Sequence, residues 1–247
     1  WPYQDETENW VLQARGQDIG NLLAVVVLVV SAIRMRAGSF GAAPWWMGAL
    51  FYLLYAYIVY AFAVHFGRLF LVYVAILGLV FFTLVIALST REPAPTYPRG
   101  RARLFAAWVL IGTGALFALL WLSEVVPATV TGQVPPSLAA AGLIVSPIHV
   151  IDLSVVLPGM IMIGVLTLRG KKTGLELTVP ALIFSVLMGS SIIAAMVLIV
   201  ATGEPSGLVP MVMVAIVVVA SLAAAIAYAP KVRDARPVVV EAGHVGT

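Results

Sequence analysis

The stretch LFLVYVAILGLVFFTLVIALS, residues 69–89, contains no charged residue, and it decides the class of the fold. An α-helix of about 20 apolar residues spans the hydrocarbon core of a bilayer. Lipid offers the backbone no hydrogen-bond partner, so a single segment of this kind satisfies its own amides and carbonyls by forming a helix. Residues 69–89 therefore predict a transmembrane helix.

Six further segments share this length and apolar character, which predicts an all-α, polytopic bundle of seven transmembrane helices. The predicted spans are 16–36, 44–66, 68–89, 102–124, 146–168, 175–201 and 207–229. Charged residues make up only 10% of the 247 residues, whereas a soluble domain has about 25%. We therefore expect no separate soluble domain. The chain divides into an N-terminal segment (1–15), a transmembrane domain (16–229) and a flexible cytoplasmic tail (230–247).

The basic residues alternate between the gaps that separate these spans. Apart from Arg15 and Arg68, all of the 14 Lys and Arg residues lie beside the gaps after the first, third and fifth spans or in the tail. Because loops rich in Lys and Arg stay in the cytoplasm, the N-terminus is predicted outside and the tail inside. Basic loops beside a membrane attract anionic lipid headgroups, so the net charge of +3 indicates the lipid bilayer and not nucleic acid as the partner.

Polar and ionisable residues gather on the predicted outer side, and they are the candidate site residues. Charged side chains within a membrane are costly, and they usually face the interior of the bundle, where they pair or bind ligands. The candidates for binding a ligand or an ion are Asp152, His149, Asp18, Arg15, Asn21, His65, Arg68 and Tyr73. The alternative is a structural role for the same groups, as charges that neutralise one another at helix ends.

Asp152 is the most deeply placed of these candidates. Ser146 is a suitable N-cap and Pro147 a suitable first residue for the fifth helix. Counting from there, Asp152 lies about 9 Å along the helix axis, where a carboxylate needs a proton or a partner. Pro158 and Gly159 follow on the same helix, and we expect them to kink it and to open a cavity beneath Asp152.

The partner of Asp152 is open at this point, with His149, Arg68 and Arg15 as candidates. His149 precedes Asp152 by three residues, which places both on one face of a helix. His65, His149 and Asp152 are suitable ligands for a metal ion. His65 and His149 belong to different helices at similar predicted depths, as a bis-histidine haem requires.

Several classes of protein are excluded or gain no support. The chain has no cysteine, which excludes disulfides and thiolate metal sites. Residues 207–229 contain no lysine to form a Schiff base, which excludes a retinal protein. The HExxH, GxSxG, Walker A and GxGxxG motifs do not occur in a usable context. We therefore do not predict an enzyme.

Three stretches carry a resemblance to other proteins: RGQD at 15–18, LFLVYVA at 69–75 and HVIDLSVVLPG at 149–159. Together they resemble an uncharacterised group of bacterial multi-pass membrane proteins, for which no activity can be carried over. The resemblance implies a bacterial plasma membrane protein, and the basic loops predict that its N-terminus is extracytoplasmic. Because the chain begins at Trp1, we expect a signal peptide or a further hydrophobic segment to precede it.

The distribution of these residues predicts a binding or transport protein whose polar site opens outward. An ion, a proton or a small polar molecule is the expected ligand, and Asp152 lies at the centre of the expected site. The alternative is a non-catalytic accessory subunit that packs within a larger membrane complex and uses the same groups structurally.

Overall fold

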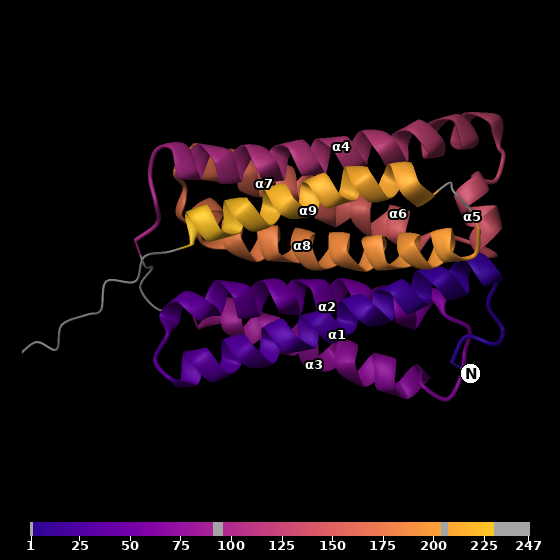
Figure 1. The fold of residues 1–247 in the computed structure, drawn as a ribbon, viewed down its shortest axis with the longest axis horizontal. Helices are drawn as coiled ribbons and strands as arrows, with labels where there is room; N and C mark the ends of the chain where they lie inside the picture. The colour runs from indigo at the N-terminus through magenta and orange to yellow at the C-terminus, as the bar shows by residue number, and fades with distance from the viewer. Residues whose placement is uncertain (1, 91–95, 204–206, 230–247) are drawn as a thin grey trace, which may run out of the picture.

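The computed structural model describes residues 2–90, 96–203 and 207–229, which form helices joined by short connections (Figure 1). Within these residues, seven helical segments are long and apolar enough to cross a membrane, which confirms the predicted multi-pass, all-α class. They are α1 (Glu8–Arg36), α2 (Ala43–Ala63), α3 (Phe70–Ser89), α4 (Arg101–Thr131), the interrupted helix Pro147–Leu168, α8 (Lys172–Ala201) and α9 (Leu208–Tyr228). The predicted tail, 230–247, lies outside the described residues.

The helix α8 lies at the centre of the bundle. It packs against α7 and α9 on one side and against α1 and α2 on the other, as Figure 1 shows. Its side chains Leu182 and Leu187 are fully buried. By contrast, α3 lies at the edge of the bundle and packs mainly against α2.

The two ends of the bundle differ in charge. The basic residues lie in alternate connections, and because successive helices run in opposite directions, these connections all lie at one end. One end carries the N-terminal segment and the short helix α5 (Pro136–Ala141), and we call it the N-terminal end. The other end, which we call the basic end, holds the end of α1, the start of α4 and the turn between α7 and α8. The described basic residues there are Arg34, Arg36, Arg99, Arg101, Arg103, Arg169, Lys171 and Lys172. If the positive-inside prediction holds, the N-terminal end faces outward.

Two glycines allow α1 to approach α8 closely. A Cβ atom at Gly16 would lie 2.5 Å from the Cβ of Ala195, and one at Gly20 would lie 2.4 Å from the Cβ of Ser191. The glycines are four residues apart and therefore lie on one face of α1. Small residues at this spacing bring helix backbones together within a membrane, where van der Waals packing drives association.

The helix between α5 and α8 begins where the sequence predicts. The hydroxyl of Ser146 accepts a hydrogen bond from the backbone N–H of His149 at 3.2 Å, and Pro147 occupies the first turn. The first segment of this helix is α6 (Pro147–Ile151). The N-cap and the N-terminal proline are confirmed.

The irregularity in this helix lies earlier than the kink predicted at Pro158 and Gly159. A π-helical turn, η2 (Asp152–Val156), separates α6 from α7 (Leu157–Leu168). The N–H of Leu157 donates to the carbonyl of Asp152, five residues back. A proline ring clashes with the carbonyl four residues before it, and the wider π turn accommodates this constraint directly ahead of Pro158.

Two helices extend beyond their predicted ends at the N-terminal end of the bundle. The helix α1 begins at Glu8, because the Thr7 hydroxyl caps it by accepting a hydrogen bond from the N–H of Trp10. The helix α4 continues to Thr131, where Gly132 adopts a left-handed conformation with φ of 66° and ends it. Their outer turns contain polar residues or proline, so apolar length alone does not reveal them.

Candidate functional site

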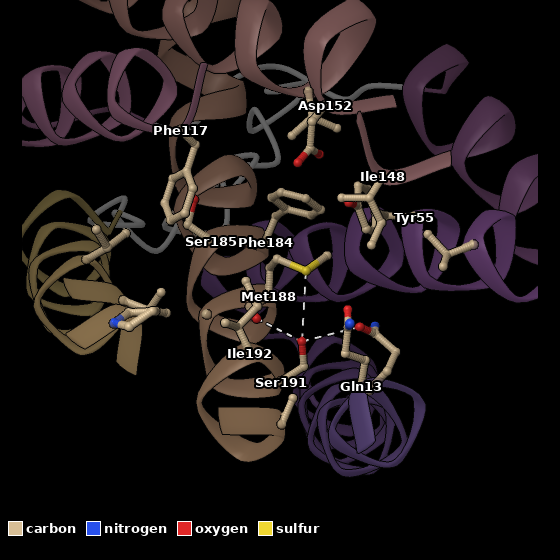
Figure 2. Close-up of a pocket in the computed structure, with 18 of the residues that line it drawn as sticks. Gln13, Tyr55, Phe117, Ile148, Asp152, Phe184, Ser185, Met188, Ser191 and Ile192 are labelled. Carbon is tan, nitrogen blue, oxygen red and sulfur yellow. Dashed lines mark hydrogen bonds between the residues drawn. The ribbon is translucent and has the colours of Figure 1, made fainter. Parts of the chain in front are cut away.

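A cavity of about 380 Å³ lies within the bundle, between all of the long helices except α3. Its wall is mainly apolar and rich in aromatic and methionine side chains. The aromatic and methionine residues that line it are Trp10, Tyr55, Tyr60, Phe117, Trp121, Met160, Phe184, Met188, Met196 and Met213. Its polar side chains are few, and Asp152 is the charged residue in the lining. Figure 2 shows part of this wall.

Asp152 belongs to the π turn, and its carboxylate points into the cavity (Figure 2). The indole Nε1–H of Trp121 donates a hydrogen bond to its Oδ2 at 2.8 Å. Tyr55, which also lines the cavity, lies close to this carboxylate. A neutral donor on α4 thus holds a half-buried acid in place at the cavity wall. Single-turn π bulges are frequent at functional sites.

These contacts change the expected partner of Asp152. Of the three predicted partners, His149 is the one that lies near, and its ring packs on Trp121 with the ring centres 4.7 Å apart. Arg15 and Arg68 are exposed. Sequence reasoning missed Trp121, because nothing in the local pattern of α4 indicates that this residue reaches α6 and η2.

On the opposite wall, hydrogen-bonded polar side chains connect α1, α2 and α8. Gln17 donates from Nε2 to the hydroxyl of Tyr52 at 2.7 Å. The hydroxyl of Ser191 lies 3.4 Å from the Oε1 of Gln17 (Figure 2). Gln13, one turn earlier on α1, also lines the cavity, and its Nε2 donates to the Oδ1 of Asn9 at 2.6 Å. The polar side chains of this wall therefore hydrogen-bond to protein groups.

Asp18 forms a second, separate cluster with tyrosines. The hydroxyl of Tyr3 lies 2.9 Å from both carboxylate oxygens, and the hydroxyl of Tyr60 donates to Oδ1 at 2.8 Å. Asn21 donates to the Tyr60 hydroxyl at 3.3 Å, and the ring of Tyr73 stacks on that of Tyr60 with centres 5.2 Å apart. The structure thus brings together the predicted residues Asp18, Asn21 and Tyr73, but around Tyr60 and not around Asp152.

The bond from Tyr3 ties the N-terminal segment to α1, and we expect Tyr3→Phe to destabilise the protein. A hydrogen bond to a charged group contributes about 1.5–3 kcal/mol, so the unfolding free energy should fall by that amount. In an Asp18→Asn background the loss should shrink to about 1 kcal/mol, as for a neutral pair. Denaturant unfolding of the four proteins of this cycle measures the coupling, and additive losses would contradict the bond.

The same contact has a defined pH dependence. Burial and the negative charge of Asp18 raise the pKa of the Tyr3 hydroxyl well above its ordinary value. A raised pKa in the folded state favours the protonated form. The contribution of the bond is therefore complete below about pH 10, the ordinary pKa of tyrosine, and falls as the pH rises above it.

His65 contacts the N-terminal segment and lies apart from both clusters. Its Nδ1 lies 3.0 Å from the Oε2 of Glu6, whose side chain is only 2% exposed, and its backbone N–H donates to the other oxygen of Glu6 at 2.7 Å. The structure does not bring His65, His149 and Asp152 together as metal ligands. Within residues 2–90, 96–203 and 207–229, no three His, Asp or Glu side chains are placed to hold a metal ion. The two histidines proposed for a haem contact Glu6 and Trp121 respectively.

Comparisons with protein-family models, with curated proteins and with solved structures gave no match for this chain. The structure itself therefore defines the class: an all-helical, multi-pass membrane protein with an apolar central cavity.

Proposed function

We propose that this protein binds a small, membrane-soluble molecule in the central cavity and serves as a binding or transport protein. The observation that carries the proposal is the carboxylate of Asp152, which accepts a hydrogen bond from Trp121 at the wall of an otherwise largely apolar cavity. A cavity of about 380 Å³ falls within the range of about 300–1,000 Å³ typical of ligand pockets. Such pockets are mostly apolar, with a few polar groups that orient the ligand.

The lining favours a ligand with an apolar body over the ion, proton or small polar molecule that the sequence predicted. A hard cation such as Ca²⁺ takes about six to eight oxygen ligands. Asp152 supplies one carboxylate, and the polar groups of Gln17 and Ser191 are already hydrogen-bonded to each other or to Tyr52. A molecule that exposes one polar group to Asp152 and apolar surface to the rest matches this wall better.

The position of the cavity supports access from the predicted outer side. Asp152 lies one and a half turns from the start of its helix at the N-terminal end of the bundle. The alternating basic residues predict that this end faces outward. We propose the plasma membrane of a bacterium as the location, with the site in the outer half of the bilayer.

Because the chain has no native cysteine, single cysteines can test access to the cavity directly. Ser185 on α8 lines the cavity and Ser221 on α9 does not, yet both side chains are buried. We expect Ser185→Cys to react with a small, membrane-impermeant methanethiosulfonate added outside right-side-out vesicles. Ser221→Cys should remain unmodified under the same conditions, since its side chain is fully buried and does not line this cavity.

The two variants form a matched pair, because each places a thiol at a buried serine of a long helix. Mass spectrometry of the intact chain measures the modified fraction, and denaturation in detergent shows that both thiols are reactive once exposed. Equal protection of both thiols in the folded protein would contradict a cavity open to the outer side.

A further inference from the structure

We infer that the ligand of the central cavity is a lipophilic organic cation, meaning an amine or quaternary ammonium group on an apolar body. The inference rests on the proposed function and specifies its substrate class. It depends on the charge balance of the cavity, on the side chains around Asp152 and on the character of the remaining wall.

The charge of Asp152 has no opposite charge in the cavity. No Lys, Arg or His side chain is among the described residues that line it. The donor to Asp152 is the indole of Trp121, which is neutral. Hydrogen bonds lower the cost of burying a carboxylate, but a buried charge is best compensated by an opposite charge within a few ångströms. A cationic ligand would supply that charge.

Several aromatic side chains of the cavity lie on the same wall as Asp152, where a cation would meet the carboxylate. In Figure 2 the carboxylate of Asp152 points toward the ring of Phe184, with Tyr55 and Phe117 to either side. Trp121 donates to the carboxylate and so lies within reach as well. A cation over an aromatic face gains about 0.5–1 kcal/mol at exposed sites and about 2 kcal/mol or more when it is desolvated.

The rest of the wall suits the apolar body of such a molecule. Met188 and Met196 line the cavity beside Phe184 and Ile192. Methionine is flexible and polarisable, and it adapts to apolar ligands of varied shape. An anion is disfavoured because it would be repelled by Asp152 without any basic residue in the lining to attract it.

Titration of the purified full-length chain in lipid nanodiscs tests the inference. The probes are benzyltriethylammonium and its neutral isostere, in which a quaternary carbon replaces the nitrogen. Tryptophan fluorescence reports binding, because Trp10 and Trp121 line the cavity. We expect the wild-type chain to bind the cation at least about tenfold more tightly than the isostere.

Asp152→Asn keeps the size and a hydrogen-bond acceptor but removes the charge, and it should weaken cation binding at least about tenfold. Binding of the neutral isostere should not change. The control is Glu124→Gln, which removes a carboxylate that accepts from the N–H of Ser137 outside the cavity, and which should leave both affinities unchanged.

Equal binding of the two probes by the wild-type chain would overturn the inference without any variant, and so would unchanged cation binding in Asp152→Asn. The modification of Ser185→Cys is independent of ligand charge. If the thiol reagent modifies Ser185→Cys but the two probes bind equally, the inference of a cationic ligand is contradicted. The proposed function as a binding or transport protein is not contradicted by that result.

Discussion

Replacing Gly16 with leucine is expected to force α1 away from α8 and to destabilise the whole bundle. A Cβ atom at this position would lie 2.5 Å from the Cβ and backbone N of Ala195 and 2.6 Å from its Cα. Backbone atoms cannot swing aside as a long side chain can, so the two helices must separate. Overpacking costs about 1–3 kcal/mol and occasionally more, and we expect a loss near 3 kcal/mol because leucine adds further atoms beyond Cβ.

Thermal unfolding in detergent measures this loss. For a chain of this size, about 3 kcal/mol corresponds to a fall in Tm of about 6–12 °C. The control is Gly112→Leu in the interior of α4, where a Cβ would meet no atom within 4 Å. Glycine is about 1 kcal/mol less favourable than the best helix formers, so this variant should melt at or slightly above the wild-type temperature. Similar melting of the two variants would refute the close approach at Gly16.

Trp10→Ala is expected to have a somewhat larger effect, because the side chain of Trp10 packs between α1 and α2. Its side chain is 4% exposed, and its Nε1–H donates to the carbonyl of Ala63 at 2.8 Å. Removing a buried tryptophan leaves a cavity, and truncations of this kind cost about 3–5 kcal/mol. The carbonyl of Ala63 also loses its donor at the end of α2, which adds about 1 kcal/mol.

The matched control is Trp108→Ala on α4, because the Trp108 side chain is 60% exposed on the outer surface of the bundle. Surface substitutions usually change stability by less than about 0.5 kcal/mol, so Trp108→Ala should melt close to the wild type. Denaturation of both variants under identical conditions compares the two tryptophans. If Trp10→Ala were as stable as Trp108→Ala, the packing at the end of α2 would not be as described.

The class of the fold could be predicted because it depends on local properties of the chain. Residues 69–89 are apolar over a length that spans a bilayer, and α3 forms over nearly the same residues, Phe70–Ser89. The start at Ser146 and Pro147 was equally local, since capping involves only the first turn. The start of α1 at Glu8 was missed, because a capped helix extends into polar sequence that no hydropathy pattern marks.

The grouping of the candidate residues could not be predicted in the same way. Asp18 and Asp152 both appeared as outer, membrane-depth carboxylates, and one site containing both was the simplest hypothesis. The structure separates them, with Asp18 held by Tyr3 and Tyr60 and Asp152 held by Trp121. Spacing along the chain fixes neighbours on one helix, but contacts between helices depend on the packing of the whole bundle.

The sequence by itself determined the seven apolar helices, the alternation of basic residues between their ends, and the position of Asp152 near the start of its helix. These follow from segment length, charge and helical rise, which are properties of each segment alone. The tertiary structure alone decided that Asp152 faces an aromatic, largely apolar cavity, because residues from α2, α4 and α8 must converge to form that wall. Convergence requires close helix packing at residues such as Gly16 and Gly20, and it is therefore a property of the assembled bundle.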